Sequence, residues 1–326
     1  MLAHQPADAH PRLDAAHGAR LPGREPQLST AGAPFTDPDD VADQLAGVGY
    51  LADDEVASAV HLATALERPL LAEGPPGVGK TALARSLAEC SGRRLVRLQC
   101  HEGIDDARAL YEWDYGRQLL ATQLLAQEAS NGNAPERLTA LFDESFLLER
   151  PLLTAIRSPE PVVLLVDEVD RADEAFDALL LEVLDEAQVT VPELGTIRAE
   201  VRPWVVLTSN ETRELADALK RRCLRIGIGY PDPEQERAIL AAAAPGLADE
   251  LGRRLVDALE RLRGAALHQP PGVAEAIEWA RALVVLEADE LDDDTIRRTL
   301  PTLLKHGRDD ATVRSVLAAA SESPES

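Results

Sequence analysis

The sequence has 326 residues, of which 45% are hydrophobic, so it is long enough for one large domain or two smaller domains with buried cores. Its 33 lysines and arginines stand against 57 aspartates and glutamates, which gives a net charge of −24 and an isoelectric point near 4.6. This charge argues against a protein that holds DNA, RNA or an anionic membrane surface through a surplus of lysine and arginine.

The first 36 residues are rich in alanine, proline, histidine, aspartate and arginine and show no apolar periodicity, which predicts a disordered tail. They lack the apolar core of a secretory signal, and no apolar run approaches the roughly 18 residues of a membrane helix. We therefore expect a soluble cytoplasmic protein. The tail contains three histidines whose spacing matches no metal-ligand motif: His4, His10 and His17. The three cysteines have no C-x-x-C spacing, which predicts neither a disulfide framework nor a zinc site: Cys90, Cys100 and Cys223.

Ordered patterning is predicted to begin at about Tyr50. Asp53-Asp54-Glu55 places acids in the first turn of a predicted helix. The apolar stripe expected on this helix consists of Val56, Val60, Leu62 and Leu66. The short apolar run Pro69-Leu70-Leu71-Ala72 then predicts a buried strand.

A complete G-x-x-x-x-G-K-[ST] motif follows this strand and precedes a helical pattern over residues 82–90. A glycine loop between a strand and a helix start directs backbone N–H groups and the positive helix end at a phosphate. Lys80 would reach the β- and γ-phosphates, and the Thr81 hydroxyl would bind Mg²⁺. A glycine turn that binds no ligand is the alternative, but the complete motif in this setting favours a nucleoside triphosphate. The candidate phosphate-binding residues are Gly74, Pro75, Pro76, Gly77, Val78, Gly79, Lys80, Thr81 and Ala82.

Residues 94–98 predict a second strand, and residues 99–161 a long, mostly helical insertion. Within the insertion, Tyr111-Glu112-Trp113-Asp114-Tyr115 alternates aromatic and acidic residues, which places the aromatic residues on one face. These aromatic residues either contact a partner or pack the insertion onto the domain, and packing is the favoured interpretation.

The continuous apolar run over residues 161–166 predicts a strand in the centre of a parallel sheet, because both faces of such a strand are covered. Asp167 and Glu168 follow it directly. Asp167 is placed to hold the Mg²⁺ shell, and Glu168 to polarise an attacking water. The alternative is that the two acids only end the strand. A helix is then expected over residues 172–186 and a β-hairpin over residues 188–198.

Residues 204–208 predict another apolar strand, which leads into Asn210. If this strand lies beside the strand that precedes the phosphate loop, Asn210 would orient the same water or the γ-phosphate; taken alone, Ser-Asn after a strand is a common loop start. Arg221 and Arg222 end a short helix over residues 215–222. They either stabilise the helix C-terminus or reach the γ-phosphate of a neighbouring subunit. Residues 224–228 predict the last strand.

Beyond Tyr230 the chain is predicted to contain only helices, over residues 234–243, 251–262, 274–286 and 294–304. We therefore expect an α/β fold with a five-stranded parallel sheet, and beside it a smaller helical domain. The expected divisions are a tail over residues 1–36, an α/β domain over 37–230, a helical lid over 231–320 and a polar tail over 321–326.

The order of these parts resembles AAA+ ATPases of the P-loop class. More narrowly, Asp167-Glu168-Val169-Asp170-Arg171-Ala172 and the hairpin after it are similar to the MoxR family. Gln99-Cys100 and residues 109–115 resemble the CoxD-like branch of that family. The resemblance covers about residues 50–286.

This resemblance implies an ATP- and Mg²⁺-dependent ATPase that forms a ring, commonly a hexamer. It also implies a chaperone role with a partner carrying a von Willebrand factor A domain, and for the CoxD-like branch a role in maturing the metal centre of a carbon monoxide dehydrogenase-like molybdenum hydroxylase. Carried over to this sequence, it makes Asn210 the first sensor and Arg222 the preferred arginine finger, with Arg221 as the alternate. One departure concerns the lid, where many AAA+ proteins present an arginine to the nucleotide. Here residues 270–275 read PPGVAE, and no arginine follows until Arg281.

Three other functions share this core: a nucleic-acid motor, a phosphoryl-transferring kinase, and a switch that binds ATP with little turnover when unpartnered. The net charge of −24 argues against the motor. The Asp-Glu pair and the helical lid suit water as the phosphoryl acceptor, which argues against the kinase. Neither observation separates the switch from the ATPase, and a client other than a molybdenum enzyme also stays open.

Overall fold

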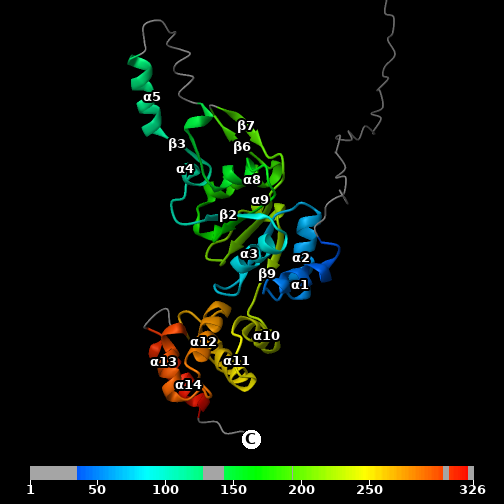
Figure 1. Cartoon of the computed structure of the whole chain (residues 1–326), viewed down its shortest axis with the longest axis vertical. Coiled ribbons are helices and arrows are strands. Elements are labelled where there is room, and N and C mark those ends of the chain that lie inside the picture. Colours follow the sequence, from blue (N-terminus) through cyan, green and yellow to red (C-terminus); the bar gives the residue numbers. More distant parts are fainter. Residues whose placement is uncertain (1–34, 128–142, 193, 304–307, 322–326) are drawn as a thin grey trace, which may run out of the picture. The chain divides into compact units, whose positions relative to one another are not determined.

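The five predicted strands form one parallel sheet in the computed structural model (Figure 1). The strand order is β2-β5-β8-β1-β9, so β1 lies between β8 and β9. Each connection along the chain therefore crosses over rather than turning back as a hairpin, which is the pattern of a parallel α/β sheet. The strands are β1 (Leu70–Glu73), β2 (Arg94–Gln99), β5 (Val162–Asp167), β8 (Trp204–Ser209) and β9 (Leu224–Gly227).

The structure describes residues 35–127, 143–192, 194–303 and 308–321. Residues 33–326 form one compact unit. The helical region over residues 231–320 is present, while the boundaries proposed for two domains stay a prediction. None of the helices in the described ranges is long and apolar enough to cross a membrane.

Two apolar layers cover the two faces of the sheet because successive side chains of a strand point to opposite faces. On β5, Leu164 and Val166 pack with α7 (Pro151–Ile156), α8 (Glu174–Glu186) and α9 (Asp217–Arg222). Val163 and Leu165 pack with α1 (Pro38–Gly47), α2 (Asp54–Ala65) and α3 (Lys80–Cys90). All six residues of β5 are buried, which confirms that this strand is central.

The helical region after β9 contains five described helices, of which the sequence patterns indicated four. A separate apolar cluster holds them together, and Trp279 is fully buried within it. The indole N–H of Trp279 donates to Thr299 Oγ1 at 2.8 Å, so the large ring is buried without an unsatisfied donor. The helices are α10 (Pro233–Ala243), α11 (Asp249–Gly264), α12 (Val273–Val285), α13 (Asp293–Leu303) and the unexpected α14 (Asp310–Ser321).

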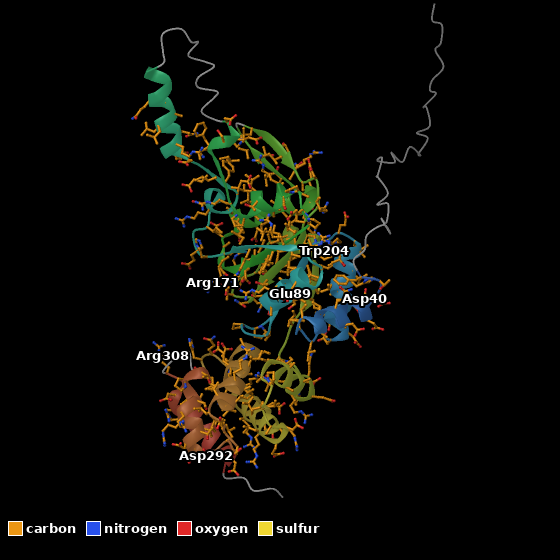
Figure 2. All side chains as sticks on the ribbon, viewed as in Figure 1. Asp40, Glu89, Arg171, Trp204, Asp292 and Arg308 are labelled. Carbon is orange, nitrogen blue, oxygen red and sulfur yellow. The ribbon has the colours of Figure 1, made fainter. Side chains whose placement is uncertain are left out.

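The N-terminal end of the ordered chain differs from the prediction. The disordered tail predicted over residues 1–36 lies mostly outside the described residues. For its last two residues the prediction is wrong, because Phe35 is fully buried against the core. Asp40, labelled in Figure 2, accepts hydrogen bonds from the backbone N–H and the hydroxyl of Thr36 at 2.8 and 2.9 Å. Order therefore begins before Tyr50, and α1 packs on the sheet through Val41 and Leu45.

The expected apolar stripe on α2 is only partly correct. Val56 and Val60 are buried, but Leu62 and Leu66 are about half exposed, at 48% and 47%. The buried face of α2 is instead completed by small residues, Ala57 and Ala63. The sequence pattern misplaced the buried face, because it followed the large leucines and passed over alanine, which contributes little to an apolar stripe.

In its described part the insertion, predicted to be mostly helical, combines helices with an antiparallel strand pair that the sequence pattern did not indicate. Its elements are α4 (Asp106–Ala109), β3 (Tyr111–Trp113), α5 (Tyr115–Gln127), a 3₁₀ turn η1 (Glu144–Phe146), β4 (Leu147–Glu149) and α7 (Pro151–Ile156). Trp113 is buried and meets Tyr111 edge-on at 6.2 Å, which agrees with packing of the insertion onto the domain. Tyr115 starts α5 and is 68% exposed, so the three aromatic residues do not share one face.

The hairpin predicted over residues 188–198 is present as β6 (Gln188–Val191) and β7 (Gly195–Arg198), with Glu193 of its turn outside the described residues. Cys90, Cys100 and Cys223 are free thiols. Burial raises the pKa of Cys100 and that of Cys223 to about 12 each.

Candidate active site

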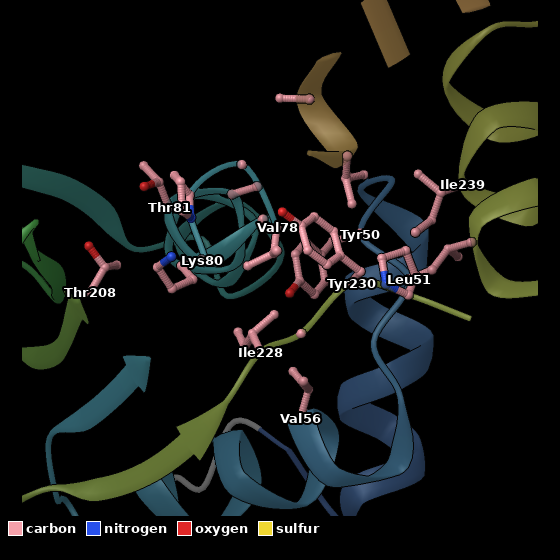
Figure 3. A pocket seen from close by; sticks show the side chains of 18 of the residues that line it. Tyr50, Leu51, Val56, Val78, Lys80, Thr81, Thr208, Ile228, Tyr230 and Ile239 are labelled. Carbon is pink, nitrogen blue, oxygen red and sulfur yellow. The ribbon is translucent and has the colours of Figure 1, made fainter. Parts of the chain in front are cut away.

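A cavity of about 520 Å³ lies at the ends of strands β5 and β8, beside the glycine loop after β1 (Figure 3). Its walls come from the glycine loop, the residues after β5 and β8, the segment 49–56, residues 228–231, and helices α10 and α12. Because β1, β8 and β5 are neighbours in a parallel sheet, the loops at their carboxyl ends meet at one edge. The cavity is therefore where the fold brings the predicted residues together.

The glycine loop adopts a backbone that requires glycine at three positions. Gly74, Gly77 and Gly79 have φ angles of +146°, +80° and +103°, in the region that side-chain-bearing residues rarely adopt. A Cβ on Gly74 would lie 2.1 Å from the carbonyl oxygen of Ile228. Gly79 is the N-cap of α3, so the loop leads its backbone N–H groups into the positive end of that helix.

Lys80 is 5% exposed, and its ammonium group is held at the loop. Its Nζ donates to the carbonyl oxygens of Gly74 and Pro75 at 2.7 and 2.6 Å. Burial lowers the pKa of Lys80 below its usual value, although Asp170 and Asp167 oppose this shift. Lys80 is thus a buried cation at the mouth of an anion-binding loop, satisfied by carbonyl groups that a phosphate could replace.

Asp167 is 2% exposed, and three side chains hold its carboxylate. Thr81 Oγ1 donates to Oδ1 at 2.8 Å, and Thr208 Oγ1 donates to the same oxygen at 2.6 Å. Arg97 Nε, from β2, donates to Oδ2 at 3.0 Å. The predicted pair Thr81 and Asp167 is therefore brought into contact across 86 positions of sequence.

Glu168 has a left-handed backbone, with φ of 55° and ψ of 51°. For a residue other than glycine this conformation is uncommon and is typical of functional sites. Its backbone N–H donates to Thr208 Oγ1 at 2.8 Å, and its half-exposed carboxylate lies 3.7 Å from Arg171. Thr208 thus links the two predicted catalytic acids, because it donates to Asp167 and accepts from Glu168.

Replacing Thr208 by valine is expected to lower ATP turnover about 10- to 100-fold, since both acids lose the hydroxyl that orients them. The nearly equal size of valine keeps β8 packed. Phosphate release under saturating ATP, together with nucleotide affinity, measures the effect. Thr64→Val is the matched control, because Thr64 is also buried in an apolar core and donates only to backbone carbonyl groups of α2. Equal losses of turnover in both variants would contradict a specific role for Thr208.

Asn210 lines the cavity directly after β8, which pairs with β1 as the sequence argument required. Asp170, which is 4% exposed, holds the loop that contains Asn210. Its carboxylate accepts from the backbone N–H groups of Asn210 and Thr212 at 3.1 and 2.9 Å, and from Thr212 Oγ1 at 2.6 Å. Burial by itself raises the pKa of Asp170, but these hydrogen bonds together lower it by more, so the net shift of the pKa is downward. Asp170 therefore stays ionised and anchors the loop that carries Asn210.

Arg221 and Arg222 do not line this cavity. Arg222, the last residue of α9, forms an ion pair with Asp185. It also donates to the carbonyl oxygen of Ala218 at 3.0 Å. Arg221 is exposed. Neither arginine can be assigned to the cavity of its own chain, so a finger role requires a second subunit.

The far end of the cavity is apolar, as a nucleotide base requires. Tyr50 and Tyr230 lie there (Figure 3). The guanidinium group of Arg263, from α11, stacks over the Tyr230 ring at 4.5 Å from the ring centroid. Burial raises the pKa of Tyr50, so this phenol stays protonated. The other apolar residues of this end are Leu51, Val56, Val78, Ile228, Ile239, Val273 and Ile277.

The donor set suits magnesium. Thr81 and Asp167 offer hydroxyl and carboxylate oxygens, the ligands that Mg²⁺ takes when it is held mostly by phosphates and water. The described residues contain no cluster of three or more histidines, cysteines or acids that could form a closed protein cage for a metal.

Sequence reasoning missed several residues of this site. Thr208 and Arg97 carry no motif signal by themselves, and Asp170 belongs to a recognised run but was given no role. Only the neighbouring strands show what these three residues do. Arg85, one turn after Thr81, lines the cavity as a second cation beside Lys80. Its i, i+4 spacing from Thr81 was a usable signal, because such residues share one helix face.

Residues 69–223 match the family described as AAA domain (dynein-related subfamily). Protein NorQ of Paracoccus denitrificans is 23% identical over 222 residues, which cover 66% of this chain and 72% of NorQ. Gas vesicle ATPase GvpN of Ancylobacter aquaticus is 25% identical over 243 residues, covering 69% of this chain and 63% of GvpN.

Chaperone protein ClpB of Staphylococcus epidermidis is 28% identical over 199 residues, covering 58% of this chain but only 19% of ClpB. Among solved structures, a RuvB variant of Thermotoga maritima aligns with a TM-score of 0.45 and 17% identity, over 89% of this chain and 80% of RuvB.

Proposed function

Because this chain is an AAA+ ATPase of the MoxR type, we propose that it is a Mg²⁺-dependent remodelling chaperone that works as a ring. One observation carries this proposal: Lys80, Thr81, Asp167, Glu168 and Asn210 line a single cavity. ATP hydrolysis is the activity of this family. The helical region beside the cavity is the part of the chain that nucleotide binding would move. The similarity to a protein named as a chaperone supports a protein substrate.

In this mechanism the chain's own residues bind and orient the nucleotide. The loop N–H groups and Lys80 hold the phosphates, and the apolar end of the cavity holds the base. Thr81 and Asp167 would hold Mg²⁺, which would neutralise negative charge on the nucleotide phosphates. Glu168 accepts a proton from the attacking water, and Asn210 orients that water or the γ-phosphate.

We propose that the client is a carbon monoxide dehydrogenase-like molybdenum hydroxylase, and that a protein with a von Willebrand factor A domain links it to the ring. The support is the resemblance of Gln99-Cys100 and residues 109–115 to the CoxD-like branch. A different protein client, or a nucleotide switch with negligible unpartnered turnover, are the alternatives. The net charge of −24 favours protein over nucleic acid as the substrate.

Co-expression tests the client. The hydroxylase subunits are produced with the von Willebrand factor A protein and either this chain or its Glu168→Gln variant. We expect a fully metal-loaded hydroxylase only with the hydrolysing chain, measured as metal content and hydroxylase activity. Equal metal loading in both cultures would contradict this client, while ATP turnover in purified protein, with and without the two partners, separates an ATPase from a partner-dependent switch. Added DNA should leave turnover unchanged.

A further inference from the structure

Helix α12 begins directly on the phosphate loop. The backbone N–H of Val273 donates to the carbonyl oxygen of Gly77 at 2.8 Å, and the N–H of Ala274 donates to the same oxygen at 3.3 Å. These are the first two residues of the helix, so the carbonyl group lies at the positive end of the helix dipole. Gly77 therefore satisfies N–H groups that have no partner within α12.

Two glycines make this contact possible. A Cβ on Gly272 would lie 2.7 Å from Gly77 Cα and 2.8 Å from its carbonyl carbon and oxygen. A Cβ on Gly77 would lie 3.1 Å from Gly272 Cα. Approaches below 3.0 Å are not seen for real Cβ atoms, and here the opposing atoms are backbone atoms that cannot rotate away. The two backbones touch because neither residue has a side chain.

Glu275 closes the same junction from the helix side. Its Oε2 accepts the backbone N–H of Gly272 at 3.0 Å, and the residue is 9% exposed. A carboxylate in the first turn is stabilised by the helix dipole. This hydrogen bond fixes Gly272 where it meets the loop.

The cations that line the cavity, among the described residues, are Lys80 and Arg85, and both belong to α3. Arg281 is instead exposed and donates to the carbonyl oxygen of Ala243 at 2.9 Å. The helical region thus contributes no arginine to the described cavity wall. Its polar contact with the phosphate loop is made by the backbone of α12.

We propose that the N-terminus of α12 couples the helical region to nucleotide binding through the carbonyl group of Gly77. The Gly77 carbonyl and the Val78 N–H belong to one peptide unit. Hydrogen bonds to the carbonyl polarise that unit and strengthen its N–H as a donor. Docking of α12 therefore prepares the loop for a phosphate, and by reciprocity a bound nucleotide strengthens the docking of α12.

The exchange for deuterium of the Ala274 amide tests this coupling in the wild-type chain. We expect ADP or ATP to slow it by roughly 3- to 10-fold, the change in equilibrium that one hydrogen bond of ordinary strength provides. An amide in the middle of α11, far from this junction, serves as the reference. Unchanged exchange at Ala274 under saturating nucleotide would overturn the proposal.

Val273→Pro removes the N–H that bonds to Gly77 without disrupting the helix, because proline is favoured at the first position of a helix. Val273→Ala shortens the same side chain but keeps the N–H, so the pair isolates the hydrogen bond. We expect Val273→Pro to bind ATP roughly 3- to 10-fold more weakly than Val273→Ala, with a smaller change in turnover at saturation. Equal affinities would overturn the proposal.

Gly272→Ala gives an independent test, since its Cβ would separate the two backbones. It should weaken ATP binding and speed exchange at both Val273 and Ala274. Gly264→Ala is the matched control, because a Cβ there meets no atom within 4 Å. This inference rests on ATP binding at the loop: a wild-type chain that bound no nucleotide would refute the proposed function as well, whereas normal wild-type binding with unaffected variants would refute only the coupling.

Discussion

Glu168→Gln is expected to reduce ATP turnover by about 10²- to 10⁴-fold, the usual contribution of a general base. The amide cannot take a proton from the attacking water. Binding of ATP should be retained, because Lys80 and the loop N–H groups remain in place. Phosphate release and nucleotide affinity, measured on the same protein, separate the two effects.

The control for this variant is Glu211→Gln. Glu211 also lies near Lys80 and also has a positive φ, of 57°, but it does not line the cavity. The substitution removes the same charge from the same region, and we expect turnover close to wild type. If Glu168→Gln turned over ATP as fast as the wild type, Glu168 would not be the general base.

Arg222→Ala is expected to lower turnover by about 10³- to 10⁵-fold if Arg222 acts as an arginine finger, while each subunit keeps its ATP. The reason is that the positive charge opposite the γ-phosphate would be lost at every junction of the ring. Arg222 pairs with Asp185, so Asp185→Ala serves as the control that breaks the ion pair but keeps the arginine. Arg221→Ala tests the alternate finger.

Mixing two inactive proteins tests whether the finger works between subunits. Arg222→Ala keeps its own Glu168, and Glu168→Gln keeps its Arg222. In a mixed ring, an Arg222→Ala subunit whose neighbour is a Glu168→Gln subunit has its own Glu168 and receives Arg222 from that neighbour. Such a site contains both residues. We expect turnover to rise well above that of either protein alone, and no rise would contradict a finger supplied by the neighbour.

Local sequence determined the chemistry at the phosphate loop and the places where strands end. The motif over residues 74–81 predicts a nucleotide site because glycine, lysine and threonine must follow one another there at fixed spacing. The fully apolar run before Asp167 predicts a central strand in the same way, since only a strand covered on both faces lacks polar positions. Both signals are contained within a few neighbouring residues, so periodicity and motif spacing reveal them.

Tertiary structure decided how these parts meet. Thr208 joins Asp167 to Glu168, and Asp170 holds the loop of Asn210, only because β5 and β8 lie side by side. The contact of Gly77 with α12 spans almost two hundred residues of sequence and is made by backbone atoms. Such contacts use common residues without local signature, and they exist only once the chain has folded. The sequence by itself therefore determined which groups handle the phosphates, while the fold determined what positions them and what they are coupled to.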